Sequence, residues 1–335
     1  MNTAPHGLHH VSALSADIAG NHDFYTRVLG LRLVKKTVNQ DSPGMYHLFY
    51  ADGAGSAGSD MTFFDFPRAA REHRGSNSIT LTTFRVTGEE ALTFWAGRLR
   101  DAGVAHGGVV DLDGRRHLFF EDPEGTRLAL FDDRGEGPRA QPNPHTDVPM
   151  TFQLQGLGYS GFTVADLAPT QAFLERGLNL REVRTYRAEG FITQVFQMNE
   201  GGPHAELHVT VRPDLPQSRP GAGSVHHVAL RLRDEAELMA WLFHLDAAGY
   251  GNSGRVDRHY FQSIYIRDPN GLVIELATDG PGFATDGPGF ATDETPDTLG
   301  QRLALPPFLE PRRATIEAHL RPLTLPQAPG EGEPA

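Results

Sequence analysis

Apolar residues along this chain follow two different spacings, which alternate from segment to segment. Residues 8–14 (LHHVSAL) and 225–232 (VHHVALRL) place apolar side chains at every second position, which is typical of strands with one buried face. Residues 235–247 place them three and four positions apart, as at Leu238, Trp241 and Leu245, which predicts an amphipathic helix. Strands and helices are therefore expected to be interleaved along the whole sequence.

The same order of segments recurs four times. Each unit contains an alternating strand, an amphipathic helix and two or three short strands. The turns EDPEGT (residues 121–126) and RDPNGL (residues 267–272) hold matching places in the second and fourth units, with Pro and Gly positioned for a tight reversal. We therefore predict an α+β fold of four βαβββ modules, forming two paired-module domains with cup-shaped mixed sheets.

Breaks in the pattern suggest where these domains end. Residues 134–149 are rich in Pro and Gly and lack periodicity, as an interdomain linker would. We predict paired modules at 1–133 and 154–278, a linker at 134–153, and a C-terminal extension at 279–335 with one short helix. Within that extension the repeated ATDGPGF suggests an expanded loop, and the last ten residues are expected to be disordered.

Composition narrows the possible partners. At 335 residues the chain exceeds the usual size of one core, which favours two domains. Its net charge of −12, with no Lys/Arg cluster, argues against nucleic acid and anionic membranes as partners. The absence of Cys excludes disulfides, thiolate zinc sites, iron–sulfur clusters and a Cys nucleophile. With no signal sequence and no apolar run near the ~20 residues that span a bilayer, we expect a cytoplasmic protein.

Two strands begin with a His-His pair, and a third contains an isolated Glu. Alternation turns the second member of each pair, His10 and His227, toward the open face of the sheet, and Glu275 lies within the apolar sequence GLVIELAT. A lone strand His is usually a hydrogen-bonded structural residue, but a carboxylate buried among Ile and Leu without a partner is costly. Together the three residues form a 2-His-1-carboxylate set with an open face, which suits Fe(II), Mn(II) or Zn(II).

These features resemble a known superfamily. Four βαβββ-like units with HHV strands and DPNG followed by a Glu are similar to the vicinal oxygen chelate superfamily, which includes glyoxalase I, extradiol dioxygenases and bleomycin-resistance proteins. More narrowly, LGLRLVKKTVNQD, MTFFDFP, DRHYFQSIYIRDPNGLVIELATDGPGF and LPPFLEPRR resemble ring-cleaving dioxygenases acting on hydroquinones, such as 2,6-dichlorohydroquinone dioxygenase and the methylhydroquinone-degradation proteins. The resemblance covers nearly the whole chain.

The resemblance implies an Fe(II)-dependent dioxygenase that binds a small, possibly substituted or chlorinated, aromatic diol and O2, and that self-associates as a homo-oligomer. It implies that the metal ligands are His10, His227 and Glu275, with Mn(II) or Zn(II) as other metals that fit them. The residues implied to act beside the metal are His9, Ser12, His226, Arg258 and Tyr265. Simple alternation back from Tyr265 places His259 rather than Arg258 on the cup face, so Arg258 requires a strand irregularity.

Aligning the units tests this assignment. The position of Glu275 is predicted to hold Ala129 in the second unit, and the position of the ligand His to hold Ile79 there and Tyr159 in the third. The active cup should therefore combine the first and fourth units, with Glu206 and His208 in the third offering a small chance of another polar site.

The alignment also separates the functions within the superfamily. Glyoxalase I-like isomerases use a fourth protein ligand on the last strand of the first unit, where the alignment predicts Phe64, and this favours dioxygen chemistry. The alternatives are a glyoxalase-like metal-dependent lyase or isomerase and a metal-free binding protein of the bleomycin-resistance kind. The second alternative would leave His10, His227 and Glu275 unexplained.

Overall fold

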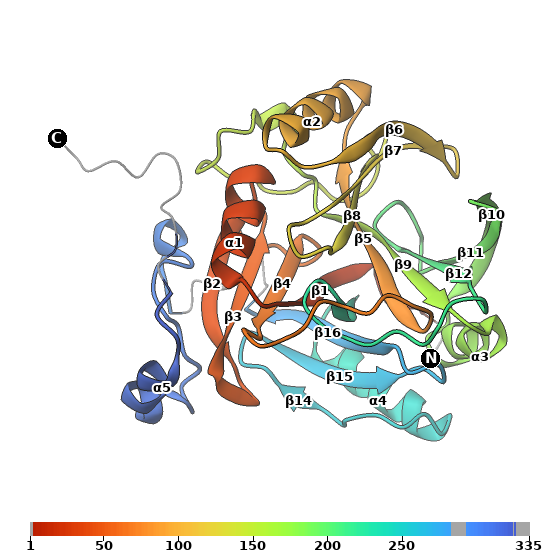
Figure 1. The fold of residues 1–335 in the computed structure, drawn as a ribbon. Coiled ribbons are helices and arrows are strands. Elements are labelled where there is room, and N and C mark those ends of the chain that lie inside the picture. The colour runs from red at the N-terminus through yellow and green to blue at the C-terminus, as the bar shows by residue number, and fades with distance from the viewer. Residues whose placement is uncertain (1–2, 283–292, 324, 326–335) are drawn as a thin grey trace.

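The computed structural model describes residues 3–282, 293–323 and 325. Two expectations, for the second ATDGPGF copy and for the last ten residues, lie outside these residues. The described strands form two eight-stranded sheets with few helices, and this confirms the predicted α+β fold of βαβββ modules (Figure 1).

The first sheet combines the two ends of the chain. Its strand order is β14-β15-β16-β13-β1-β4-β3-β2, so strands of the fourth module lie beside strands of the first. The bounds are β1 (Leu8–Ser15), β2 (Arg32–Asn39), β3 (Ser42–Ala51), β4 (Asp60–Asp65), β13 (Val225–Leu232), β14 (Val256–Asp257), β15 (Phe261–Arg267) and β16 (Val273–Pro281).

The second sheet combines the two middle modules in the order β10-β11-β12-β9-β5-β8-β7-β6. Its bounds are β5 (Ser78–Val86), β6 (His106–Leu112), β7 (Arg115–Glu121), β8 (Arg127–Asp132), β9 (Leu157–Val164), β10 (Arg181–Ala188), β11 (Phe191–Gln197) and β12 (Glu206–Val211). Each sheet thus draws on both halves of the chain, while the boundaries at residues 133, 153 and 278 stay a prediction.

One helix follows the first strand of each module. These helices are α1 (Ile18–Asp23), α2 (Glu89–Asp101), α3 (Leu167–Ala172) and α4 (Glu235–Ala247), and α1 and α3 each continue into a π-helical turn, at Phe24–Val28 and Phe173–Gly177. Asp17, Asp166 and Asp234 cap α1, α3 and α4 by accepting a backbone N–H, which satisfies a donor that the first turn leaves free. Of the described helices, none is long and apolar enough to cross a bilayer.

The core lies where these helices pack on the sheets. Trp95 of α2 and Trp241 of α4 are fully buried there, together with the apolar strand residues Phe84 and Leu230. Burial of such side chains contributes about 1.5–3 kcal/mol each, so the helices hold one face of each sheet rigidly. The other face of each sheet is left to form a cup.

The C-terminal extension packs on the outside of the first sheet. Its short helix α5 (Arg313–His319) buries Ile316 against an apolar cluster that includes Val38 of β2. Arg321 makes a double ion pair with Asp65 of β4, with distances of 2.9 and 2.6 Å. This extension therefore supports the strands that carry one wall of the cup.

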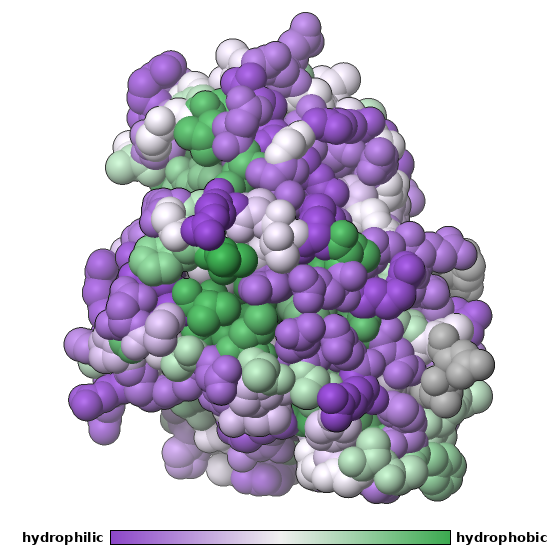
Figure 2. Space-filling model, turned by 90° about the vertical axis from the view of Figure 1, so that its right-hand side faces the viewer, coloured by the Kyte–Doolittle hydropathy of each residue, from purple (hydrophilic) through white to green (hydrophobic). Residues whose placement is uncertain are grey.

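The face that carries β10, β11 and β12 is turned to the viewer in Figure 2, which shows mostly hydrophilic residues around a smaller apolar area. Val183 of β10 and Ile192 of β11 are among the exposed large apolar side chains. Scattered apolar residues of this kind are usual on soluble domains.

Candidate metal centre

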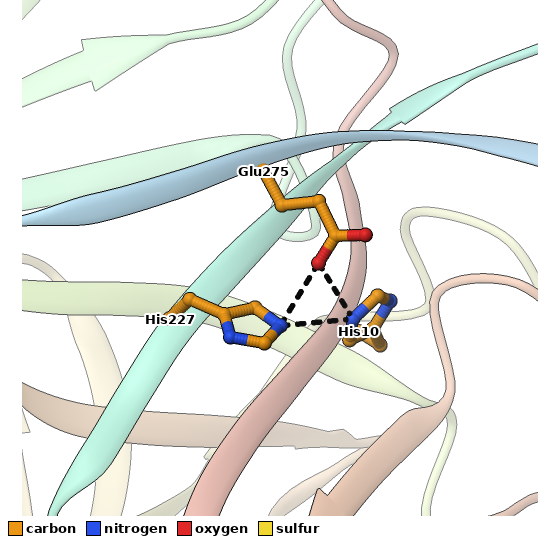
Figure 3. A group of neighbouring side chains, drawn as sticks. All are labelled: His10, His227 and Glu275. Atoms are coloured by element: carbon orange, nitrogen blue, oxygen red, sulfur yellow. Dashed lines mark hydrogen bonds and ion pairs between the residues drawn. The ribbon is translucent and has the colours of Figure 1, made fainter. Parts of the chain in front are cut away.

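Strand pairing in the first sheet brings three distant residues together. Antiparallel pairing of β1 with β13 sets His10 opposite Ala229 and Ser12 opposite His227, and parallel pairing of β13 with β16 sets Ala229 beside Glu275. The three side chains that project from these neighbouring strands, His10, His227 and Glu275, point toward one another (Figure 3). The two ends of the chain therefore build one cluster.

The cluster is compact and buried. His10 Nε2 lies 3.3 Å from His227 Nε2, and Glu275 Oε2 lies 3.2 and 2.9 Å from these two atoms. The residues are 2%, 3% and 0% exposed, in the same order. Among the described residues, this is the one group of three or more His, Cys, Asp or Glu side chains arranged to hold a metal ion.

His9 determines which nitrogen of His10 faces the cluster. The Nε2 atom of His9 lies 3.0 Å from the carbonyl oxygen of Thr278, so it must carry the proton and donate it. Burial, with His10 second, holds the pKa of His9 well below its ordinary value, so the ring is neutral and its Nδ1 is an acceptor. That Nδ1 lies 2.8 Å from His10 Nδ1, which must then be the donor. The lone pair of His10 is left at Nε2, toward Glu275.

The second pair repeats this arrangement. His226 Nδ1 lies 2.7 Å from His227 Nδ1, and donation from His227 to His226 would leave the lone pair of His227 at Nε2, toward Glu275. Burial lowers the pKa of His227, although the neighbouring Glu275 acts to raise it. In both pairs the first His orients the second, which is what metal-binding imidazoles require of their neighbours.

The electrostatics of the cluster favour a cation. Burial opposes ionisation of Glu275, but His10 and His227 outweigh it and hold the pKa of the carboxyl well below its usual range. Glu275 Oε1 accepts a hydrogen bond from Ser263, whereas Oε2 has no hydrogen-bond donor among the described residues. One carboxylate oxygen and two imidazole nitrogens thus converge on one buried point, and a divalent metal ion fits such a set.

A cavity of about 650 Å³ opens above the cluster. His10 and His227 lie at its base, and its walls include the aromatic rings of Phe49, Phe64 and Phe261. An apolar cavity with a few convergent polar groups is the usual form of a small-molecule site. Its size and aromatic walls suit a planar ring.

Arg258 and Tyr265 form the polar part of the wall. Arg258 Nε donates to Tyr265 Oη at 3.1 Å, so the phenol's own proton is free to point elsewhere in the cavity. Burial, with Glu275 second, raises the pKa of Tyr265 and keeps the phenol protonated at neutral pH. Arg258 reaches this place because the chain bends after β14, where His259 has a φ of 67°. That bend is the irregularity the sequence required.

The structure brings together most of the predicted site residues. Ser12, His226, Arg258 and Tyr265 line the cavity with the two His of the cluster. His9 is fully buried behind His10, outside the residues that line the cavity, so it acts on the ring of its neighbour.

Strand register corrects two aligned positions. Ala229, two residues after His227, pairs with Glu275, and Ser12, two residues after His10, pairs with Thr62. The residue equivalent to Glu275 in the first module is therefore Thr62, and the prediction of Phe64 was wrong by two residues. The prediction of Ile79 was also wrong. Because Thr83 pairs with Ala129, Leu81 is the equivalent of His10.

The second cup lacks a comparable ligand set. Its residues at the three positions of the cluster are Leu81, Tyr159 and His208, and the ring of His208 stacks on Tyr159 with centroids 3.8 Å apart. Glu206 is held by Arg184 at 2.8 Å and by His208 at 3.1 Å. These polar side chains have protein partners, so we interpret the second cup as structural.

The sequence did not reveal His47. It lies on β3, lines the cavity, and donates to or accepts from Thr62 Oγ1 through Nε2 at 2.8 Å. In MYHLFYA it appears as an isolated His on an alternating strand, and only the register of β3 on β4 shows where it points.

The fold and the cluster together define a member of the glyoxalase/bleomycin resistance protein/dioxygenase superfamily. The chain belongs to this superfamily, which it matches over residues 7–130 and 156–276. This confirms the resemblance found in the sequence.

Within the superfamily, similar proteins carry dioxygenase names. The chain is 48% identical over 319 residues to MhqA of Bacillus subtilis (strain 168), which its name provisionally assigns to the ring-cleaving dioxygenases; the match covers 95% of this chain and 98% of MhqA. It is 28% identical to the chlorohydroquinone/hydroquinone 1,2-dioxygenase of Sphingobium indicum, and this match covers 91% of this chain and 92% of the Sphingobium protein. A crystal structure from Bacillus subtilis, provisionally named a dioxygenase, superimposes with a TM-score of 0.86 at 31% identity, covering 97% of this chain and 99% of the other.

Proposed function

We propose that this protein is an Fe(II)-dependent dioxygenase that cleaves the ring of hydroquinone-type aromatic diols. The observation that carries the proposal is the set of three buried ligand atoms of His10, His227 and Glu275, beside an aromatic-walled cavity. The names of the similar proteins, which include a hydroquinone 1,2-dioxygenase, support the same reaction.

Three protein ligands on one side of a metal leave its other side open, and bound Fe(II) would there supply sites for a substrate oxygen and for O2. Mn(II) and Zn(II) fit the same three residues, and their effect on activity is part of the test. Thr62 supports an open site, because a hydroxyl already bonded to two side chains replaces the fourth ligand expected of a glyoxalase I-like isomerase.

The side chains around the cavity would bind and orient the diol. Phe49, Phe64 and Phe261 would pack on the ring, excluding water from it. Tyr265, protonated and positioned by Arg258, would donate a hydrogen bond to an oxygen that gains negative charge during the reaction. His226, exposed in the cavity and bonded to His227, would move a proton between substrate and solvent.

The direct test is anaerobic reconstitution with Fe(II), followed by oxygen-uptake measurements with hydroquinone, chlorohydroquinone, catechol and a methylglyoxal–thiol adduct. We expect uptake with a quinol and no conversion of the adduct. Conversion of the adduct without oxygen uptake would instead establish the lyase or isomerase alternative. Retention of ligand binding after complete metal removal, with no turnover of any kind, would establish the metal-free binding protein.

The Tyr265→Phe variant tests whether the phenol in the cavity wall takes part in the reaction. It removes the phenol proton and keeps the ring, so the iron content should be unchanged while turnover falls by about 10²–10⁴-fold. A variant with the parent's turnover would show that Tyr265 only packs in the cavity.

A further inference from the structure

A hydrogen-bonded chain of three side chains begins beside the metal centre. Ser12 Oγ lies 2.8 Å from Thr62 Oγ1, and Thr62 Oγ1 lies 2.8 Å from His47 Nε2. Ser12 and Thr62 are fully buried, whereas His47 is partly exposed to the cavity that it lines. Its other ring nitrogen, Nδ1, makes no hydrogen bond with any described residue.

The buried hydroxyls determine the proton position in His47. If Ser12 donates to Thr62, and Thr62 donates to Nε2, both buried protons are used. In the opposite direction the proton of Ser12 has no partner among the described residues, which costs about 1–3 kcal/mol. The chain therefore runs from Ser12 to His47 and leaves the imidazole proton on Nδ1, toward the cavity.

Aromatic packing fixes the ring that carries this proton. The centroid of His47 lies 4.1 Å from that of Phe49 and 4.1 Å from that of Phe64. Burial, with His10 second, lowers the pKa of His47 well below its ordinary value, so the ring is neutral. A neutral, immobile N–H donor at the wall of a cavity is suited to one oriented acceptor.

The second cup contains the same arrangement in a closed form. Strand pairing makes His117 the equivalent of His47, and it lies between Phe119 and Phe131, with centroids 5.4 Å away on each side. Both of its nitrogens have protein partners: Nδ1 donates to the Arg115 carbonyl at 3.0 Å, and Nε2 accepts from Tyr159 Oη at 3.1 Å. In the second cup both nitrogens of the His thus have partners, whereas in the cup with the metal cluster Nδ1 of His47 has none within the described part of the chain.

The position of His47 indicates which part of a substrate it would meet. His47 contacts the metal centre through another ring, because the centroid of Phe64 lies 4.1 Å from that of His47 and 6.4 Å from that of His227. Arg258 already donates to Tyr265 and to Asp41, so its guanidinium is engaged elsewhere. An acceptor for His47 would thus belong to the side of the diol remote from the metal.

Building on the proposed function, we propose that His47 donates its Nδ1 proton in a hydrogen bond to the substrate oxygen remote from the metal, and that it thereby selects para-diols over ortho-diols. Thr62 is the positioning residue that holds His47 in the donor tautomer. In an ortho-diol both oxygens lie on the metal side, so His47 has no oxygen to bind.

His47→Phe is the main test, because a phenyl ring keeps the packing between Phe49 and Phe64 while it removes the donor. We expect kcat/KM for hydroquinone to fall about 10–100-fold, with catechol turnover or, if catechol is not cleaved, its inhibition constant changed less than about 3-fold. The matched control is His117→Phe in the other cup, which should leave kcat/KM for hydroquinone unchanged. Equal losses with both substrates, or no loss with hydroquinone, would overturn the inference.

A second measurement does not depend on activity. Long-range ¹H–¹⁵N spectra of the metal-free protein should show His47 protonated at Nδ1, and Thr62→Val should shift that proton toward Nε2. Protonation at Nε2 in the parent would overturn the inference even if the protein is a quinol dioxygenase. Absence of oxygen uptake by the parent, with the Nδ1 tautomer present, would count against the proposed function instead.

Discussion

Replacing Glu275 with Gln should stabilise the metal-free protein. Glu275 Oε2 lies 2.9 and 3.2 Å from the Nε2 atoms of His227 and His10, and it accepts no hydrogen bond from the described residues. The Gln side chain can keep its oxygen toward Ser263 and turn its NH2 group toward His10 and His227, donating to both. A buried charge without a donor is thereby exchanged for a neutral group with partners.

The size of this effect follows from the contacts. Relief of one unsatisfied buried acceptor is worth about 1–3 kcal/mol, and the free energy of unfolding should rise by that amount. The gain in stability on binding metal should instead be larger for the parent than for the variant. The parent gains about 2.7 kcal/mol when Fe(II) is present at 100 times its Kd, whereas the variant, lacking the anionic ligand, should gain much less.

Denaturant unfolding with and without anaerobic Fe(II), for both proteins, measures all four free energies. Glu237→Gln offers a matched control, because Glu237 also contacts a His, at 2.9 Å from His6 Nε2, but lies away from the cluster. Its response to Fe(II) should equal the parent's. The reasoning is refuted if Glu275→Gln is less stable than the parent without metal and gains as much from Fe(II).

Three further outcomes are expected. His9→Phe should lower Fe(II) affinity about 10–100-fold in a metal titration, because nothing then holds the proton on Nδ1 of His10; unchanged affinity would contradict the tautomer assignment. Burial lowers the pKa of His117 to about 4, against about 6.5 in an unfolded chain, so the unfolded state binds a proton that the native state does not. Stability should therefore fall as the pH drops from 6.5 to 4, by up to about 3 kcal/mol from this residue, and His117→Phe should show a shallower slope of denaturation midpoint against pH. Arg321→Ala should destabilise the fold by about 1–3 kcal/mol in urea, because it leaves Asp65 buried without its partner, whereas Arg100→Ala, at an exposed ion pair with Asp101, should be nearly neutral.

The repeat made much of the fold predictable. Four matching units and two matching DP turns were enough to predict the βαβββ modules and the pairing of the first with the fourth. Alternation also turned His10 and His227 toward one side of the sheet, where the structure brings them together with Glu275. Such inferences need only the period of the strands.

Register between strands was less predictable. The strand pattern predicted Phe64 at the position that Thr62 occupies, because a slip of two residues keeps every side chain on the correct face. His47 was not predicted as a site residue, because its partner hydroxyl, that of Thr62, belongs to a different strand. The role of His9 needed the position of the Thr278 carbonyl, which no side-chain pattern encodes.

The nested strand order has a consequence for synthesis on the ribosome. β1 must wait for β13, about 210 residues further along, before its second edge is paired, while β5 and β9 can pair earlier. At about 5–20 residues per second, β1 keeps an open edge for roughly 10–40 seconds of elongation. An unpaired apolar strand is prone to join another chain. The middle modules are thus expected to close first, and a nascent chain that stalls before residue 225 exposes the strand that carries His10.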